Sequence, residues 1–242
     1  MDPIAIASAS GLRTRVQALD ILANNIANSS TAGFKSDHEF SSLFDSIDGE
    51  ASAQNLTSAN NGWTDFSQGT ILPSGNPLNF ALSGPGLFAV DGKGGQLYTR
   101  NGSFIVSTSG ELMTTEGYPV RAKGGGRITL APGVEVKADA QGRLSQNGQP
   151  VGQLEIVRFQ KPTDLGKQGA NYYKTSGPGI KSQESEATVT QAALEGSNVS
   201  TAEATVRLVN VMRHYESLQK AVSLSTEMSR KAIEEVARVS GS

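Results

Sequence analysis

The residue types that support catalysis or metal binding are sparse in this chain. Only two histidines occur, His38 and His214, and they lie far apart in the sequence. Imidazole is the usual general base near neutral pH, and a metal site would need carboxylates beside it at ligand spacing. Asp37 and Glu39 flank His38, but sequence neighbours in a strand or helix point to different sides. We therefore expect no metal site, and a solvated or partner-facing position for each histidine.

Motifs for phosphate binding and nucleophilic catalysis are also missing. The run from Asp91 to Gly95 is rich in glycine but lacks the spacing of a phosphate loop, so we expect a hairpin turn there. The chain has no Gly-x-Ser-x-Gly elbow and no cysteine, which excludes a thiolate nucleophile, a disulfide and Cys-ligated zinc. A carbohydrate-active enzyme would need two converging carboxylates, and no convincing pair stands out. We expect no catalytic residue, no cofactor and no small-molecule substrate.

The charge balance limits the possible partners. Lys and Arg number 21 and Asp and Glu 23, so the formal net charge is −2, which argues against binding to nucleic acid or to an anionic membrane surface. Charged residues make up 18% of the chain, below the quarter typical of soluble domains, so other protein is expected to cover much of the surface. No apolar run is long enough to span a membrane, and the N-terminus lacks the features of a cleaved signal peptide.

The N-terminal segment, residues 1–35, has the pattern of a helix followed by a turn. Asp2 is expected to cap the helix, Pro3 to be its first residue, and Gly33 to reverse the chain. The apolar residues follow the 4-3-4-3 spacing of a coiled-coil seam. This N-terminal seam consists of Ala5, Ala9, Leu12, Val16, Leu19, Ala23 and Ile26.

Three amides, Asn24, Asn25 and Asn28, fall outside this seam, on the outer side of the helix. A helix face without charge is more typical of a protein contact than of a solvated surface. We therefore expect the amides to be buried between subunits, where a neutral amide avoids the desolvation cost of an ion. The alternative is a polar helix end that frays into a loop.

The C-terminal segment, residues 200–242, predicts a second and longer helix. Ser200 and Glu203 match a capping box. The C-terminal seam holds heptad spacing through Ala204, Leu208, Val211, Tyr215, Leu218, Val222, Ser225, Ser229, Ala232, Val236 and Val239. Such a helix would be about 60 Å long and needs a partner along its apolar stripe. The alternative, an amphipathic helix packed on its own domain, is disfavoured because the middle of the chain is too compact to cover it.

The middle of the chain is rich in short alternating stretches separated by glycine turns. Strands are expected at 78–84, 86–92, 96–100, 103–108, 111–115, 118–123, 126–131, 134–138, 143–146 and 150–160. Asn147-Gly148 predicts a tight hairpin. Turns at such short intervals favour an antiparallel barrel or sandwich over parallel βαβ units.

Together these patterns predict a mixed fold, in which an antiparallel all-β central domain is flanked by terminal α-helices that pair as a coiled coil. The expected parts are the N-terminal helix and turn (1–35), an extended connector (36–75), the central β domain (76–177), a return connector (178–199) and the C-terminal helix (200–242). Two apolar seams at opposite ends of one chain are most simply buried against each other and then against other copies. We therefore expect terminal helices that become ordered on assembly, when burial outweighs chain entropy.

The chain resembles the bacterial flagellar basal-body rod and hook proteins along most of its length. The motifs that carry this resemblance are LDILANNIANSSTAGFK (19–35), YTRNGSFIVSTSGELMTTEGYPV (98–120), QLEIVRFQKP (153–162), GANYYKTSG (169–177) and ALEGSNVSTAEATVRLV (193–209). Within the family, the length of the chain and residues 64–90 look most like the proximal-rod branch, and the distal-rod branch is the alternative.

The resemblance implies a structural subunit of the rod, the periplasm-spanning shaft that transmits torque from the motor to the hook. It implies export by the flagellar type III apparatus without a cleaved signal peptide, and assembly with copies of itself and with other rod and hook proteins. A different class of protein remains as an alternative, namely a secreted adhesin-like binding module whose helices form a parallel coiled coil.

Overall fold

The structure of the chain, a computed structural model, describes residues 3–41, 59–169, 171–177 and 179–240. Its contacts divide the chain into two compact units. The helical unit consists of residues 1–27, 37–63 and 200–242, and the β unit of residues 28–36 and 64–199. Each unit is therefore assembled from segments that lie far apart in the sequence.

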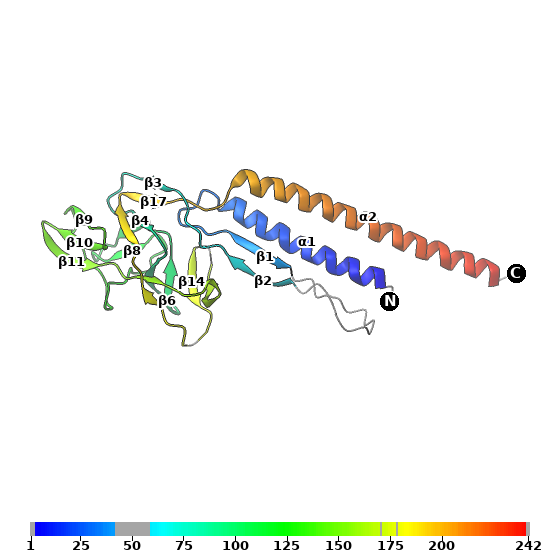
Figure 1. The fold of residues 1–242 in the computed structure, drawn as a ribbon, viewed down its shortest axis with the longest axis horizontal. Helices are drawn as coiled ribbons and strands as arrows, with labels where there is room; N and C mark the ends of the chain where they lie inside the picture. The colour runs from blue at the N-terminus through cyan, green and yellow to red at the C-terminus, as the bar shows by residue number, and fades with distance from the viewer. Residues whose placement is uncertain (1–2, 42–58, 170, 178, 241–242) are drawn as a thin grey trace. The chain divides into compact units, whose positions relative to one another are not determined.

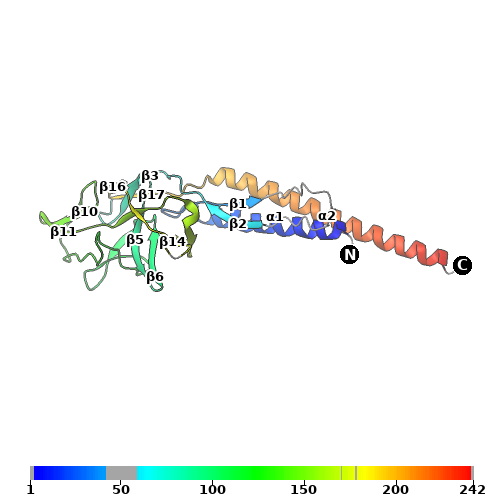
Figure 2. The same cartoon turned by 60° about the horizontal axis from the view of Figure 1, so that its bottom comes forward.

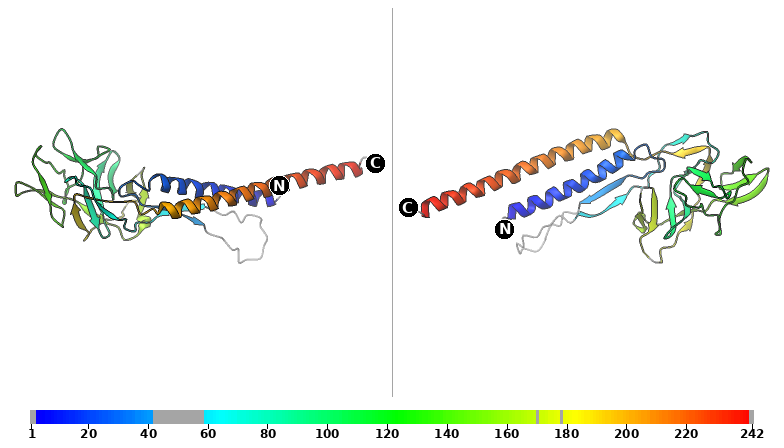
Figure 3. Two further views of the ribbon diagram at one scale, coloured as in Figure 1. Left: turned by 90° about the horizontal axis from the view of Figure 1, so that it is seen from above. Right: turned by 180° about the vertical axis from the view of Figure 1, so that it is seen from behind.

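Two long helices dominate the helical unit. Helices α1 (Pro3–Ala27) and α2 (Thr201–Ser240) lie side by side and run in opposite directions (Figures 1 and 3). This confirms the expected pairing of the terminal helices. The Ser200 hydroxyl oxygen accepts the N–H of Glu203 at 3.4 Å, as expected for an N-cap. Asp2, the expected cap of α1, lies outside the described residues.

A two-stranded sheet completes the helical unit. Strands β1 (Asp37–Ser41) and β2 (Ala59–Thr64) lie along α1 (Figure 2). A Cβ atom on Gly62 would lie 3.8 Å from Ile21 Cδ1, so β2 also approaches this helix closely. α1 therefore contacts α2 and the β1–β2 pair at the same time. Neither helix has an apolar stretch long enough to cross a membrane in the part of the chain that the structure describes.

The β unit is antiparallel throughout the pairs that the structure describes. Its largest sheet has six strands in the order β13-β14-β6-β5-β12-β15. Their bounds are Leu165–Lys167, Tyr172–Thr175, Gly95–Thr99, Leu87–Gly92, Ile156–Arg158 and Gln183–Glu184. A three-stranded sheet joins β11 (Gln149–Gln153), β10 (Arg143–Gln146) and β9 (Val136–Ala138). A short 3-10 helix, Pro162–Asp164, precedes β13.

Three further strand pairs complete the unit. β16 (Thr188–Gln191) pairs with β4 (Phe80–Ser83), β17 (Ala193–Glu195) with β3 (Ile71–Pro73), and β7 (Phe104–Val106) with β8 (Leu112–Thr114). The main core lies among these sheets, with Phe80, Phe88, Phe104, Leu112 and Ile128 fully buried. The expected antiparallel β domain is confirmed.

Residues with positive φ angles mark turns between the strands. Asn147 and Gly148 have φ angles of 51° and 76° and connect β10 to β11, which confirms the predicted tight hairpin. The strands expected at 118–123 and 126–131 form only isolated bridges. The glycines at positions 124–126 between them all have positive φ, and this conformation interrupts an extended strand.

The range 36–75, expected to be a single extended connector, is divided between the two units. β1 and β2 belong to the helical unit, whereas β3 belongs to the β unit. Two aromatic residues of this range, Trp63 and Phe66, stack within their own unit. Trp63 stacks on His38 at a centroid distance of 4.7 Å, and Phe66 packs against Tyr173 at 4.9 Å.

Candidate functional site

The seam on α2 coincides with its less exposed face. Between Thr201 and Met228, the buried or half-buried positions are Ala204, Leu208, Val211, Tyr215, Leu218, Val222 and Ser225. All remaining side chains in this range are exposed. The side chains of Ser229, Ala232, Val236 and Val239 lie outside the described residues. The heptad pattern thus marks the face that packs in the single chain, and its role in assembly remains a prediction.

Among the described side chains of α1, the two that are buried do not belong to the predicted N-terminal seam. The fully buried helix positions are Ala18 and Asn25, one heptad apart, and a Cβ on Gly11, one heptad earlier, would lie 3.6 Å from Leu218. Of the seam residues, Val16 and Ala23 are exposed, while Leu12, Leu19 and Ile26 are half-buried. The side chains of Ala5 and Ala9 lie outside the described residues.

Asn25 does not lie on the outer side of α1 with the other amides, and that expectation was wrong. Its side chain is 5% exposed. The amide nitrogen donates to the backbone oxygen of Asp37 at 2.7 Å, and the amide oxygen accepts the N–H of Asp37 at 2.9 Å. Asn25 therefore pairs with the first residue of β1 as a neighbouring strand would. Asn24 is exposed and Asn28 half-buried, so the three amides occupy different environments.

The turn that follows α1 belongs to the β unit. Gly33 has a φ of 69°, and its N–H donates to the backbone oxygen of Glu195 at 2.7 Å. A Cβ at this position would lie 2.4 Å from the backbone nitrogen of Asn101, so a residue larger than glycine would collide with the backbone. Phe34 is 1% exposed and lies beneath the ammonium of Lys167, 4.1 Å from the ring centroid.

A buried ion cluster lies at this turn and consists of Lys35, Arg100 and Glu195. One Glu195 carboxylate oxygen accepts from Lys35 Nζ at 2.6 Å and from the N–H of Gly69 at 2.9 Å, and the other accepts from Arg100 Nε at 2.5 Å. The three side chains are between 0% and 4% exposed. Such charges persist in a protein interior only when they are paired and fully hydrogen-bonded.

Backbone carbonyls accept further hydrogen bonds from the two cations of the cluster. Lys35 Nζ also donates to the oxygen of Ser67 at 2.5 Å. The Arg100 guanidinium donates to Leu82 at 2.8 Å and also to Gly86. Burial lowers the pKa of Lys35 and the nearby charge of Arg100 lowers it further, whereas the hydrogen bond and charge of Glu195 oppose this shift. The cluster thus holds two cations against one carboxylate.

The sequence matches family models in three separate stretches. Residues 7–35 match the model described as flagella basal body rod protein, residues 81–149 match the flagellar hook protein FlgE/F/G D1 domain, and residues 190–235 match the flagellar basal body rod FlgEFG protein C-terminal region. The flagellar basal-body rod protein FlgF of Caulobacter vibrioides is 33% identical over 227 residues, covering 91% of this chain and 92% of that protein.

The chain belongs to the flagellar basal-body rod protein family. A FlgF protein of Mesorhizobium japonicum is 32% identical and covers 89% of this chain and 90% of its own length. A FlgG protein of Agrobacterium fabrum is 29% identical, and the alignment covers 95% of this chain and 97% of that protein. The chain is a FlgF-like structural subunit of the flagellar basal-body rod and not an enzyme. Membership in the rod protein family implies assembly with other rod subunits.

The ion cluster joins all three family segments of this rod protein. Lys35 ends the first segment, Arg100 lies in the second and Glu195 in the third. Sequence reasoning assigned these residues no role. One signal in the sequence could have identified them, because each lies within a motif shared with the family. Lys35 follows Gly33-Phe34, and Glu195 lies between Leu194 and Gly196.

The two histidines of the rod protein lie in different environments. His38 stacks on Trp63, and His214 is exposed on α2. In the part of the chain that the structure describes, no three side chains of His, Asp or Glu lie close enough together to hold a metal ion.

Proposed function

We propose that this protein is a proximal-rod subunit that polymerises helically through its terminal helices into the torque-transmitting shaft. Large apolar side chains remain exposed on both helices, namely Val16 on α1 and Val206, Val209, Met212, Leu224 and Met228 on α2. These side chains and the Leu12, Leu19 and Ile26 stripe are the observation that carries the proposal. An apolar helix surface of this extent is stabilised by contact with other subunits.

We further propose that the chain reaches the rod through the flagellar type III export apparatus in an unfolded state. The absence of cysteine means that no disulfide can block threading. The β unit needs residues from both flanking family segments to complete its ion cluster. It can therefore complete this cluster only after the chain has emerged as far as Glu195.

The proposed function is tested by deleting the gene and examining isolated basal bodies. We expect cells that lack a distal rod and hook, with motility restored by the wild-type gene, and we expect mass spectrometry to detect the protein in wild-type basal bodies. Complete hooks in the deletion strain, or basal bodies without the protein, would contradict the proposal.

An adhesin-like module remains the second hypothesis, since α2 holds heptad spacing along its length. That reading requires a peptide of residues 200–242 to form a stable soluble oligomer by itself. The rod proposal expects this peptide to be largely unstructured by circular dichroism, because the apolar surface that it would bury lies on other segments and subunits.

A further inference from the structure

A small pocket opens on the second face of the six-stranded sheet, away from the main core. Leu87 and Val157 point to this face, because side chains alternate along β5 and β12. Phe66, Phe159 and Leu165 complete the apolar wall. The pocket has a volume of about 220 Å³. The Phe159 ring is held edge-on against Tyr98 at a centroid distance of 4.9 Å, so this wall is preformed.

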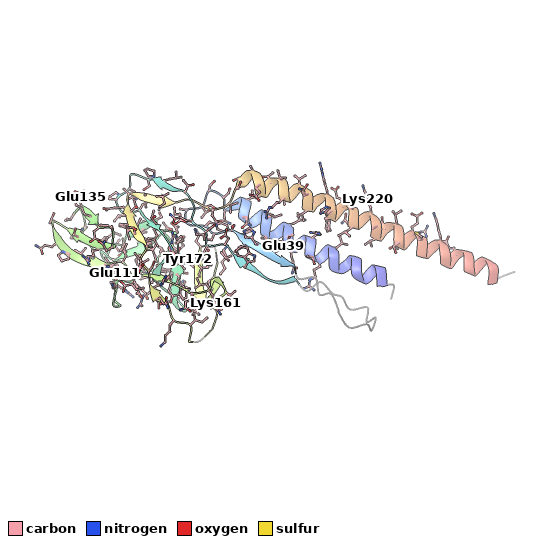
Figure 4. The ribbon with its side chains drawn as sticks, in the orientation of Figure 1. Glu39, Glu111, Glu135, Lys161, Tyr172 and Lys220 are labelled. Carbon is pink, nitrogen blue, oxygen red and sulfur yellow. The ribbon has the colours of Figure 1, made fainter. Side chains whose placement is uncertain are left out.

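The polar lining of this pocket carries one sign of charge. Among the described residues that line it, four are cations and none is a carboxylate. These cations are Lys35, Arg100, Arg158 and Lys161. Lys35 and Arg100 are 1% and 4% exposed, whereas Arg158 and Lys161 (labelled in Figure 4) are exposed at the rim. The cationic ends of the ion cluster thus form the buried part of the lining.

The charge of this lining is only partly compensated. Glu195 is the one carboxylate paired with Lys35 and Arg100 among the described residues. Two other carboxylates lie close by: the charge of Asp65 acts to raise the pKa of Lys35, and Asp164 accepts the backbone N–H of Lys161. The four cations therefore face three carboxylates. The remaining positive charge lies with Arg158 and Lys161 at the exposed rim, and it favours the approach of an anion. The pocket is therefore complementary to a carboxylate accompanied by apolar surface.

The volume of the pocket indicates what kind of group carries this carboxylate. Metabolite pockets usually enclose about 300 to 1,000 Å³, so a space of about 220 Å³ suits one or two amino-acid side chains better. The larger groove beside β15, about 820 Å³, is lined by Lys123 and Arg143 but also by three glutamates. The charged residues of that groove carry one more negative than positive charge, so it does not favour an acidic occupant.

We propose that the pocket is a socket for an acidic residue and an adjacent apolar residue of a neighbouring rod subunit. This inference rests on the proposed rod function and names one surface that such a neighbour contacts. The apolar side chain packs between the rings of Phe66 and Phe159, and the carboxylate pairs with Arg158 and Lys161 at the rim. Arg158 and Lys161 at the rim attract the acidic segment before contact. Docking thereby places the neighbouring subunit beside Lys35 and Arg100 of the ion cluster.

The test uses the full chain in cells, with Phe159 replaced by the photoreactive residue p-benzoylphenylalanine. After irradiation, basal bodies are purified and the cross-linked peptide is identified by mass spectrometry. We expect a peptide of a rod subunit in which Asp or Glu lies within two residues of a large apolar residue. The matched control places the same photoreactive residue at Ile105, an apolar β7 residue that is 41% exposed and outside the pocket. It should not cross-link to that peptide.

A charge-reversal pair provides the second measurement. Arg158→Glu should lower the yield of this cross-link and the number of flagella per cell at least tenfold. Lys137→Glu, which reverses an equally exposed cation on β9, should change neither. Replacing the identified partner carboxylate by lysine should restore assembly in the Arg158→Glu strain.

The possible outcomes separate this inference from the proposed function. If the Phe159 variant enters basal bodies but cross-links to nothing, or only to a segment without a carboxylate, the socket is overturned while the rod function stands. Normal assembly of Arg158→Glu would also overturn it. If the unsubstituted protein is missing from basal bodies, the proposed function fails and the inference fails with it.

Discussion

Lys35 Nζ lies 2.6 Å from Glu195 Oε1, although the two residues are 160 positions apart in the chain. Lys35 follows the end of α1 by a short turn, and Glu195 shortly precedes α2. Arg100 contacts the same carboxylate. The ion pair thus joins the first segment of the β unit, residues 28–36, to the end of its second segment, residues 64–199. The cluster therefore links residues that lie next to each terminal helix in the sequence.

Replacing Glu195 with Gln should destabilise the β unit strongly. The change leaves Lys35 and Arg100 buried without a counter-charge, which costs about 3 to 5 kcal/mol in the free energy of unfolding. Urea denaturation of the purified protein measures this loss. Glu184→Gln is the control, because the side chain of Glu184 is 67% exposed in its pair with Lys123 and should contribute less than about 1 kcal/mol. A loss below about 1 kcal/mol for Glu195→Gln would refute the role of the cluster.

Replacing Asn25 with Ala should loosen the start of β1. The substitution leaves both backbone groups of Asp37 without their amide partner, at a cost of about 1 to 3 kcal/mol. Trp63 is the only tryptophan of the chain and stacks on His38, next to Asp37, so its fluorescence reports on this region. We expect a red shift of its emission, and no shift for Arg13→Ala at an exposed position of the same helix. Unchanged emission in Asn25→Ala would contradict this role.

The Tyr172–Glu116 hydrogen bond should make stability depend on acid pH. Burial alone would raise the pKa of Glu116, but hydrogen bonds from Tyr172 and other nearby groups outweigh it and lower the pKa below its usual 4.5. The stabilisation is therefore present above pH 4.5 and is lost as the pH falls through the lowered pKa. Figure 4 labels Tyr172 within the β unit.

Tyr172→Phe keeps the ring that packs edge-on against Tyr118 but removes the donor. We expect a loss of about 1 kcal/mol at neutral pH, a value reduced because Glu116 is solvent-exposed. The difference from wild type should shrink in acid, as measured by urea denaturation across this pH range. Tyr215→Phe on α2 should show no such pH dependence. A difference that grows in acid would exclude this account.

Introducing a charge into either seam should block rod assembly. Leu19→Asp and Leu218→Asp place an unpaired carboxylate on apolar faces, which costs several kcal/mol when those faces are buried. We expect non-motile cells, while hydrogen exchange shows that the β unit remains folded. Ser223→Asp, at an exposed position of α2, should assemble normally. Normal motility of both seam variants would count against the seam assignment.

Hydrogen exchange on the purified monomer should distinguish the two units. We expect rapid exchange in α1 and α2 and protection from about residue 75 to 175, because most side chains of α2 are exposed and a helix with one covered stripe gains little from burial in water. Uniform slow exchange along the whole chain would show that the helices do not require assembly for their order.

The amino-acid pattern by itself determined the local structure of this protein. Heptad spacing located the packing face of α2, Ser200 its start, and Asn147-Gly148 a hairpin, because each depends on residues close together in the sequence. Tertiary structure decided which side chains of α1 are buried, since Ala18 and Asn25 lie outside the predicted seam and Asn25 is covered where it bonds to Asp37 of β1. It also decided the roles of Lys35, Arg100 and Glu195. Local sequence patterns do not show that two cations far apart in the chain will bind the same buried carboxylate.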